Sequence, residues 1–314
     1  MQAWIYRRYG GPEVLELARL DVPPPRRGEL RLRVRAFALN PLDWKLRSGQ
    51  FRILTRGGLP RGVGYDVCGT VDAAGPGTAM PEGQHVVGMI DPYASRLGAA
   101  AEYACVREDH AVALPAPLAP TDAAALPGAG LTALQALRKA RIRAGQRALV
   151  VGASGGVGSF AVLLARLDGL HVSAAASAAG QEHLRGLAPD RAIDASREDW
   201  RELAERFDLV FDCTGASTFA QCRHLLARTG VYANTLPNGA MYRAALWAAL
   251  TSRQRVVPVM ERPVREDLAK LVALAAEGRL RVPVTRVAAM RDVPELEREL
   301  EAGRGRGKFV VALP

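Results

Sequence analysis

Short runs of alternating apolar and polar residues fill the first 120 positions, and Gly and Pro interrupt them. The segment LRLRVRAFAL (30–39) alternates with a period of two, which is typical of a half-buried strand. GTVDAAG (69–75) and HVVGMI (85–90) are further strand candidates, and turn residues separate them, as in PEGQ (81–84). The pattern predicts a compact β-rich domain.

Between about residues 121 and 260 the pattern changes to continuous apolar runs that alternate with helical stretches. The predicted strands are 148–151, 170–176, 207–212, 230–234 and 255–259, and the predicted helices are 156–168, 181–187, 217–227 and 240–250. Strands that are apolar throughout are typical of a parallel sheet covered by helices on both faces. The segment therefore predicts an α/β domain with a doubly wound parallel sheet.

The last segment mixes both element types. It predicts a helix over 264–278, a strand over 281–287, a helix over 292–303 and a closing strand over 307–313. Asp292 followed by Glu295 resembles a capping box at the start of the third of these elements. Strands of this kind can rejoin the β-rich domain, so we expect one domain from 1–120 plus 261–314 and a second from 121–260.

The stretch ASGGVG (153–158) follows a predicted strand and opens a predicted helix. It fits the relaxed form of G-x-G-x-x-G, in the context that this motif needs. Gly155 lets a pyrophosphate approach bare backbone, and Gly158 lets the helix pack closely on the strand. The N–H groups at the helix start attract phosphate. The predicted phosphate-binding residues are Ser154, Gly155, Gly156, Val157 and Gly158.

The next strand and turn, LHVSAAASAAGQ (170–181), contain no acidic residue before Glu182. An acid at this place holds the ribose 2′-hydroxyl of NAD, whereas its absence permits the 2′-phosphate of NADP. Ser177 is placed to donate a hydrogen bond to that phosphate, and we expect Arg191 to supply the positive charge. The sequence thus favours NADP(H) as cofactor.

Composition adds few constraints. The chain of 314 residues carries a formal charge of +10, but its basic residues are spread along the sequence, so we expect no specific nucleic-acid partner. The four cysteines form no C-x-x-C pair. The chain has neither an apolar run long enough to cross a bilayer nor a signal-peptide pattern, so we expect a cytoplasmic protein without a membrane partner.

Taken together, several segments resemble the zinc-independent quinone oxidoreductase branch of the medium-chain dehydrogenase/reductase superfamily. They are ALNPLDWKLRSG (38–49), GYDVCGTV (64–71), GAAAEYACV (98–106), LPGAGLTALQAL (126–137), GASGGVG (152–158) and GRGKFVV (305–311). The resemblance covers nearly the whole chain. It implies a GroES-like catalytic domain built from both chain ends and a Rossmann domain inserted between them.

The resemblance also bears on metal content. Zinc-using relatives place a Cys near Asn40, a His-Glu pair at Tyr65 and Asp66, and a third ligand near Gly128. None of these positions carries a Cys or His here. Catalytic zinc sites use three protein ligands that include His or Cys, so we expect no metal site.

Three catalytic candidates follow from the resemblance. Asn40 corresponds to an Asn near the nicotinamide, and Lys45 to a lysine that can bond the ribose or the acceptor oxygen. Tyr65 either lines the pocket or is a core tyrosine. Trp44 stands where many quinone reductases have Tyr, which places a Tyr-donor mechanism in question and adds an apolar wall.

Further cofactor contacts are implied by position. We expect Thr132 near the nicotinamide or its phosphate, and Lys308 to reach toward the phosphates. Loops after the fourth and fifth Rossmann strands supply the remaining candidates, which are Thr214, Gly215, Asn234 and Leu236.

The predicted function is NADPH-dependent, metal-independent hydride transfer to a quinone or an α,β-unsaturated carbonyl. Arginines at 52, 56 and 61 keep an enoyl-thioester reductase open as an alternative, and a low-turnover NADPH-binding sensor is another. The apolar strand RVVPVM (255–260) predicts a homodimer formed by pairing across that edge.

Overall fold

The computed structural model describes residues 1–55 and 58–314, and its chain divides into two compact units. The β-rich unit comprises residues 1–128, 263–278 and 282–314, and the parallel-sheet unit comprises residues 129–262 and 279–281. The boundaries differ from the predicted ones chiefly because the short helix α2 (Pro120–Ala124) packs on strands of the β-rich unit.

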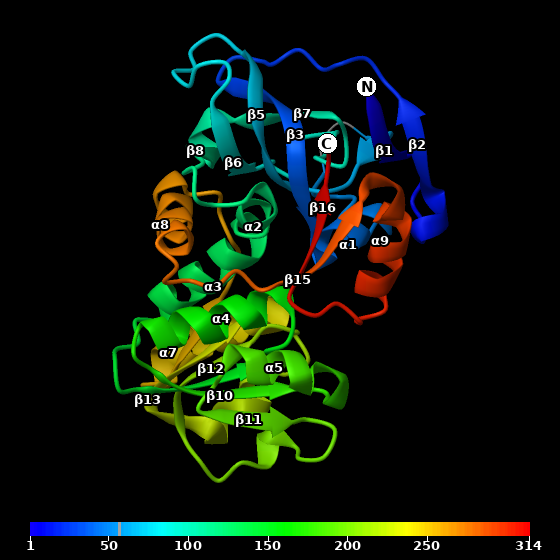
Figure 1. Cartoon of the computed structure of the whole chain (residues 1–314). Coiled ribbons are helices and arrows are strands. Elements are labelled where there is room, and N and C mark those ends of the chain that lie inside the picture. Colours follow the sequence, from blue (N-terminus) through cyan, green and yellow to red (C-terminus); the bar gives the residue numbers. More distant parts are fainter. Residues whose placement is uncertain (56–57) are drawn as a thin grey trace. The chain divides into compact units, whose positions relative to one another are not determined.

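The main sheet of the β-rich unit has seven strands (Figure 1). They are β3 (Glu29–Leu39), β5 (Asp66–Ala74), β6 (His85–Met89), β7 (Tyr103–Arg107), β8 (Ala111–Ala113), β15 (Val284–Ala289) and β16 (Lys308–Ala312). The order is β15-β16-β3-β5-β6-β8, and β7 also pairs with β3. The C-terminal strand β16 thus lies inside this sheet, next to a strand from the start of the chain. Leu30, Leu32 and Val34 are buried on β3, as its alternation predicts.

A second, three-stranded sheet of this unit has the order β2-β1-β4. Its strands are β1 (Gln2–Tyr6), β2 (Leu15–Arg19) and β4 (Arg61–Gly62). The other helices of the unit are α1 (Pro41–Arg47), α8 (Arg265–Ala276) and α9 (Val293–Glu301), with 3-10 turns at Pro12–Val14, Glu108–His110 and Met290–Asp292.

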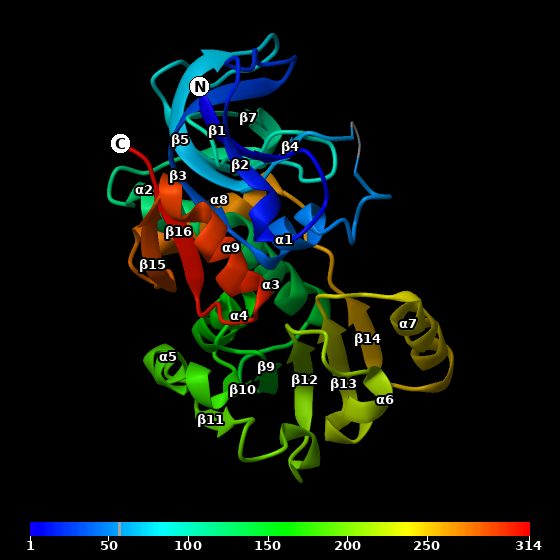
Figure 2. The same cartoon turned by 90° about the vertical axis from the view of Figure 1, so that its right-hand side faces the viewer.

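The parallel-sheet unit has six strands in the order β11-β10-β9-β12-β13-β14, all parallel (Figure 2). They are β9 (Arg147–Val151), β10 (His171–Ala176), β11 (Arg191–Asp194), β12 (Phe207–Asp212), β13 (Leu226–Asn234) and β14 (Arg255–Pro258). This is the Rossmann order, with its topological switch point between β9 and β12. The predicted α/β fold class is confirmed.

The helices that belong to this sheet are α4 (Gly156–Leu167), α5 (Gln181–Leu187), α6 (Phe219–Cys222) and α7 (Gly239–Thr251), and most of α3 (Pro127–Ala140) also belongs to this unit. The 3-10 turns are Ala178–Gly180, Trp200–Glu202 and Arg223–Leu225. The α4 helix packs on β9 and β10, and α7 packs against the edge strand β14. No helix within residues 1–55 and 58–314 is long and apolar enough to cross a membrane.

Two local predictions were wrong. The helix predicted over 217–227 is only one short α-helix, because the chain already enters β13 at Leu226. The capping box at Asp292 is absent from α9, since the Asp292 carboxylate instead accepts the N–H of Ala289, the residue before the 3-10 turn Met290–Asp292.

Candidate active site

The glycine turn connects β9 to α4 at the switch point of the parallel sheet. Helix α4 begins at Gly156, and its N-cap is Gly155, which offers no side chain to the first turn. The N–H groups of a first helical turn have no partner inside the helix and carry partial positive charge. The end of α4 is therefore suited to an anion, as the sequence predicts.

The two glycines of this turn are needed for different reasons. A Cβ added to Gly158 would lie 2.2 Å from the carbonyl oxygen of Gly152, so only glycine allows the helix to sit this close to the strand. A Cβ at Gly155 would have no neighbour nearer than 3.5 Å, and its φ of −78° suits any residue. The protein itself leaves room beside Gly155, which is the open backbone that a pyrophosphate requires.

A buried carboxylate organises the neighbouring loop, which follows β12. Asp212 is fully buried, and it accepts hydrogen bonds from the backbone N–H groups of Thr214, Gly215 and Ser217 at 2.8–2.9 Å. The Thr214 hydroxyl also donates to it, at 2.7 Å. Thr214 and Gly215 are thus held at the carboxyl end of β12, where Rossmann folds bind their ligands.

The loop after β13 is held in a similar way. The buried Asn234 side chain donates to the Tyr232 hydroxyl at 2.9 Å and accepts the N–H of Leu236 at 2.7 Å. Because the Asn234 amide and the Leu236 N–H are both engaged within the protein, these two residues shape the loop, and the Leu236 N–H is not available to a cofactor.

The structure separates the two residues predicted to bind a 2′-phosphate. Ser177 is exposed directly after β10, at the carboxyl edge of the sheet. The Arg191 guanidinium instead pairs with Glu198 at 2.7 Å and Glu205 at 3.1 Å, in a hollow with Arg147 and His171 at the amino ends of the strands. This placement argues against a cofactor role for Arg191.

Another arginine lies at the correct edge. Arg197 follows β11, its side chain is 87% exposed, and its Nε forms an ion pair with the Asp194 carboxylate at 3.6 Å. The neighbouring Ser196 hydroxyl accepts the N–H of Ala178, which joins this loop to the turn that contains Ser177. Arg197 lies just after the carboxyl end of the third strand of the sheet in chain order, and this position is the sequence signal that identifies it. Arg191 lies at the start of the same strand.

Thr132 is buried on α3 of the same unit. Its burial allows a contact with a ligand only through a small exposed part of its side chain. No observation on its surroundings distinguishes a cofactor contact from a packing role, so the predicted contact stays a prediction.

In the β-rich unit, a buried ammonium group joins the strand ends that carry the catalytic candidates. Lys308 begins β16, is 2% exposed, and donates from Nζ to Asn40 Oδ1 at 2.5 Å and Asp66 Oδ2 at 3.1 Å. Asp66 also accepts the Asn40 amide at 2.9 Å and the N–H of Gly128 at 2.8 Å. Lys308 and the Asn40 amide are therefore committed to this cluster, which argues against Lys308 reaching for cofactor phosphates.

Asp43 anchors the turn that carries Asn40. Its carboxylate accepts the N–H of Asn40 and the N–H of Gly64, both at 2.6 Å. Complete burial raises the pKa of the Asp43 carboxyl to about 7, although the two N–H donors oppose this shift. These contacts give Asp43 a structural role in holding the turn.

Lys45 has a different environment from Lys308, although the two lysines belong to the same unit. It is half-buried on α1, and its Nζ lies 5.6 Å from the centre of the Trp44 ring. Partial burial lowers the pKa of the Lys45 ammonium. None of the ion pairs within residues 1–55 and 58–314 includes Lys45, so its ammonium is not committed to a carboxylate.

Two other candidates are part of the core. Tyr65 is 2% exposed, and its hydroxyl donates to the Gly62 carbonyl at 3.2 Å, which argues for the core interpretation and against the catalytic one. Arg61 is fully buried and donates to the carbonyls of Pro92 and Ser95 at 2.7 Å, which removes it as a substrate anchor. Arg52 is exposed, and Arg56 lies outside the described residues.

The geometry defines a class of protein: an oxidoreductase with a Rossmann unit that offers a bare phosphate-binding turn and a separate GroES-like unit. Comparisons with known proteins agree. The profile of the alcohol dehydrogenase GroES-like domain matches residues 26–116, and that of the zinc-binding dehydrogenase family matches residues 187–311.

Among curated proteins, a chloroplast envelope quinone oxidoreductase homolog from Arabidopsis thaliana is 32% identical over 324 residues, covering 99% of this chain and 98% of the relative. An NADPH-dependent alkenal/one oxidoreductase of the same plant is 36% identical over 223 residues, which cover 68% of this chain and 58% of that protein. The solved structure of a quinone oxidoreductase from Coxiella burnetii aligns with a TM-score of 0.92 at 30% identity, over 100% of this chain and 99% of that one. The chain belongs to the quinone oxidoreductase family of the medium-chain dehydrogenase/reductase superfamily.

Proposed function

We propose that this protein is an NADPH-dependent reductase of quinones and α,β-unsaturated carbonyl compounds that works without a catalytic metal. The observation that carries the proposal is the glycine turn at the switch point, which keeps an open backbone surface beside Gly155. Relatives named for quinone and alkenal/one reduction support the acceptor class. Bound NADPH would supply the hydride, and such acceptors need no metal to accept it.

The parallel-sheet unit supplies the residues that would hold this cofactor. The turn from Ser154 to Gly158 presents N–H groups and little side chain to the pyrophosphate. Ser177 and Arg197 would bind the 2′-phosphate, since one is a hydroxyl donor and the other an exposed cation at the same sheet edge. No acidic residue lies between the end of β10 and Glu182 to repel that phosphate, which favours NADPH over NADH.

Lys45 would act on the acceptor. As a carbonyl acceptor is reduced, negative charge grows on its oxygen, and a positioned ammonium stabilises that charge. Lys45 is suited to this task because it is partly desolvated and is not neutralised by a carboxylate. The Trp44 ring beside it offers an apolar surface for a flat, conjugated acceptor.

The Lys308 ammonium supports metal independence. In zinc-using relatives, the metal ligands lie at positions near Asn40, Asp66 and Gly128. Here the Asp66 carboxylate accepts hydrogen bonds from the Asn40 amide and the Gly128 N–H, and the Lys308 ammonium supplies the positive charge beside it. Within the described ranges, no group of three or more His, Cys, Asp or Glu side chains is arranged to hold a metal ion. An internal cation that satisfies Asp66 leaves no donor set for zinc.

Quaternary structure and compartment remain part of the proposal. β14 is an edge strand of the parallel sheet, so pairing with a second copy would cover it, although Pro258 limits the ladder. Static light scattering tests the homodimer, and a monomeric mass at working concentration contradicts it. We keep a cytoplasmic location as the expectation, although relatives are named as chloroplast proteins.

The decisive experiment follows the loss of NADPH absorbance with quinones, enones and enoyl thioesters as acceptors. We expect turnover with quinones or enones, a preference for NADPH over NADH, and no loss after dialysis against a chelator. Turnover with enoyl thioesters alone would select the alternative substrate class. Tight NADPH binding without turnover on any acceptor would instead favour the sensor function.

A further inference from the structure

A chain of hydrogen bonds runs from α5 to the glycine turn. His183 Nε2, on α5, lies 2.8 Å from the hydroxyl oxygen of Ser159 on α4. That hydroxyl donates to the carbonyl of Ala153, at the start of the turn, at 3.3 Å. A hydroxyl group has one proton and a carbonyl oxygen only accepts, so the His183 ring donates its Nε2–H to Ser159. The protons of both bonds therefore point from α5 toward the turn.

Most of this chain is shielded from water. Ser159 and Ala153 are fully buried, and His183 is half-buried. The two helices that carry the chain, α4 and α5, pack on each other (Figure 1). A buried carbonyl that loses its donor retains the cost of its lost hydration. The bond from Ser159 therefore constrains Ala153 more strongly than a bond at the surface would.

The same bond sets the direction of one peptide group in the turn. The peptide bond between Ala153 and Ser154 is trans, and in a planar trans peptide the C=O and the N–H point in opposite directions. With the carbonyl held toward Ser159, the Ser154 N–H points away from that residue. The Ala153 N–H donates to the Ala175 carbonyl at 3.0 Å, so Ala153 is held on both sides. The backbone of the turn is thus fixed before a cofactor binds.

Helix α5 is itself held against the sheet. The Gln181 side chain donates from Nε2 to the carbonyls of Ala176 and Ile193, at 2.8 and 2.9 Å. Ala176 is the last residue of β10 and Ile193 belongs to β11, so these bonds tie the first turn of α5 to both strands (Figure 2). His183 follows two residues later, and its ring therefore extends from a fixed point of the backbone.

The loop proposed to bind the 2′-phosphate contacts the glycine turn directly. It begins at Ser177 and continues through the 3-10 turn Ala178–Gly180 into α5. A Cβ added to Gly180 would lie only 2.4 Å from Ser154 Oγ, so the two segments are in close contact. The two loops that would hold the phosphates are therefore joined twice, by this contact and by the hydrogen bonds of His183.

We propose, on the basis of the NADPH-dependent function above, that His183 is a positioning residue for the cofactor, which acts through Ser159 on the glycine turn. A binding surface that is already ordered loses less conformational entropy on binding, and its ligand binds more tightly. His183 thus contributes to affinity for the pyrophosphate, which NADPH and NADH share. Arg197, by contrast, would act on the 2′-phosphate alone.

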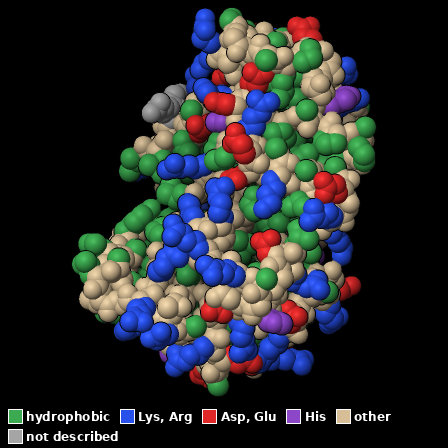
Figure 3. Space-filling view, turned by 90° about the vertical axis from the view of Figure 1, so that its left-hand side faces the viewer, with side chains coloured by type: hydrophobic (Ala, Val, Ile, Leu, Met, Phe, Trp, Pro, Cys, Tyr) green, Lys and Arg blue, Asp and Glu red, His purple; other side chains and the backbone are tan. Residues whose placement is uncertain are grey.

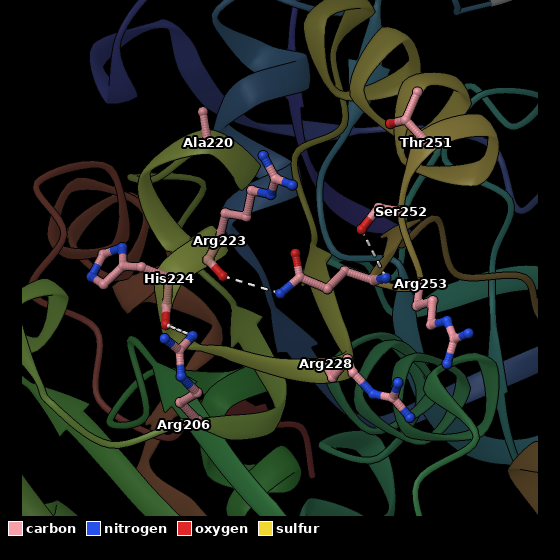
Figure 4. Close-up of a pocket in the computed structure, with 9 residues that line it drawn as sticks. Arg206, Ala220, Arg223, His224, Arg228, Thr251, Ser252 and Arg253 are labelled. Atoms are coloured by element: carbon pink, nitrogen blue, oxygen red, sulfur yellow. Dashed lines mark hydrogen bonds between the residues drawn. The ribbon is translucent and has the colours of Figure 1, made fainter.

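Positive charge elsewhere on the protein is the main alternative source of affinity for a polyanion. Figure 3 shows Lys and Arg side chains spread over one face of the molecule. A basic hollow of about 620 Å³, whose lining includes Arg206, Arg228 and Arg253, lies at the amino edge of the parallel sheet (Figure 4). The glycine turn follows the carboxyl end of β9, at the opposite edge, so arginines of this hollow supply a control.

The test is isothermal titration of H183L and H183Q with NADPH and with NADH. H183L should raise the Kd of both cofactors about tenfold, because the Ser159 hydroxyl loses its donor and the turn is less ordered. H183Q should restore most of the affinity, since its side-chain amide can donate in place of the ring. In turnover assays of H183L, the KM for NADPH should rise, while kcat at saturating NADPH changes by less than about twofold.

Matched variants separate this role from general effects of charge and folding. H171L removes an exposed histidine at the start of β10, and R228Q/R253Q removes two charges of the basic hollow, so both should bind NADPH like the unchanged protein. S159A should weaken binding as H183L does, and the double variant should be no weaker than the weaker single variant. If H183L does not fold, S159A and H183Q carry the test.

Three results would overturn the proposal. Unchanged affinity in H183L and S159A would mean that the turn is held without this chain. A loss for NADPH alone would mean that His183 acts on the 2′-phosphate. A lower kcat with an unchanged KM would place His183 in the chemical step. Titration reads binding without turnover, so a protein that binds NADPH through this chain but reduces no acceptor contradicts only the proposed reductase, and this inference stands.

Discussion

The two glycines of the turn, Gly155 and Gly158, have different roles. Gly158 meets the strand so closely that any side chain would collide with the Gly152 carbonyl, whereas Gly155 has space that no part of its unit fills. The motif pattern predicted both positions, because the two requirements coincide in one short sequence.

Replacement of Gly155 by Asp should abolish NADPH binding, because the new carboxylate would place bulk and negative charge against the pyrophosphate. The free energy of unfolding should change by less than about 1 kcal/mol, since the site is open and its φ is ordinary. Isothermal titration and urea unfolding measure the two effects. G186D, at an exposed position on α5, is the control, and unchanged affinity in G155D would mean that phosphates bind elsewhere.

Lys45 gives a second prediction at this scale. K45M should lower kcat by about a hundredfold, because a donor that stabilises developing oxyanion charge is typically worth two to three orders of magnitude. Its unfolding should be nearly unchanged, and K45R should retain part of the activity. K270M, on the exposed side of α8, is the matched control. Full activity of K45M would mean that Lys45 has no role in catalysis.

Lys308 should instead matter for stability. K308M leaves Asp66 buried without its cation, and removal of one partner of a buried pair costs about 3–5 kcal/mol. The double variant K308M/D66N should recover much of that loss, because no charge is then left unpaired. Urea unfolding of the three variants checks this, and a K308M variant as stable as the unchanged protein would contradict the role of the ammonium.

Residue types alone did not reveal these roles. Sequence position suggested a cofactor contact for Lys308 and left Tyr65 open between the pocket and the core, and the burial of both side chains argues for structural roles. The Lys308 ammonium is satisfied within its own unit, and the Tyr65 hydroxyl donates to a carbonyl of its own chain. The sequence prediction chose Arg191 and not Arg197, because a sequence without strand boundaries does not show at which end of a strand a side chain emerges.

Among the elements, α1 and α9 are joined by a buried cluster of one arginine and two glutamates. Arg47 is fully buried and donates to Glu297 at 3.0 Å and to Glu301 at 2.7 Å. One oxygen of Glu297 is buried and has no partner in the described part of the chain. Burial raises the pKa of the Glu297 carboxyl to about 8, with the charge of Asp43 adding to the shift and that of Arg47 opposing it.

The sign of the resulting pH dependence follows from linkage. The native state holds a proton on Glu297 up to about pH 8, whereas the unfolded chain releases it near its ordinary value of about 4.5. Stability from this group is present below pH 4.5 and is lost as the pH rises toward 8. Asp43 adds a loss in the same direction, complete near pH 7.

The E297Q variant should flatten this dependence. At pH 5 its free energy of unfolding should lie within about 1 kcal/mol of the unchanged protein, and the difference should shift in favour of the variant by pH 9. Urea unfolding across this range is the measurement. E299Q, on the same helix but half-exposed beside Arg286, should keep the original slope. Parallel curves for E297Q and the unchanged protein would show that Glu297 is ionised throughout.

Elements with strong periodicity were predicted well, and those shaped by tertiary contacts were not. All five strands predicted for the parallel sheet appear, because uninterrupted apolar runs fit strands buried on both faces. The stretch from 217 to 227 has helix-forming residues, but Arg206 and Gln254 bind the Leu226 carbonyl and Leu226 joins β13. These partners are distant in sequence, so a local pattern does not contain them.

For the whole molecule, the family and both fold types followed from the order of motifs along the chain. The parallel-sheet unit has the Rossmann strand order, and the β-rich unit takes strands from both ends of the sequence. The exposed apolar side chains of α7, which include Leu246 and Leu250, were not foreseen, since its sequence is that of an ordinary core helix and only the fold exposes them.

Cofactor preference can be tested on the intact chain. NADP⁺ at a hundredfold excess over its Kd should raise the free energy of unfolding by about 2.7 kcal/mol, and the same concentration of NAD⁺ should raise it less. The R197E variant should lose this difference, because it replaces the proposed partner of the 2′-phosphate with a like charge. R185E, on α5, is the matched control. An R197E variant that still prefers NADP⁺ would place the 2′-phosphate elsewhere.

The position of β16 inside the main sheet constrains the order in which the molecule is made. A ribosome delivers β3 early, and β7 pairs with residues 29–33 on one edge of it. The strand that pairs with residues 36–39 of that edge emerges only with residues 308–312. The inserted parallel-sheet unit ends at residue 281 and is by then completely synthesised, so it can fold while the earlier β-rich segment is still unpaired. Translation thus completes the second unit of the sequence before the first, and residues 36–39 of β3 keep an open, aggregation-prone edge until residues 308–312 are synthesised.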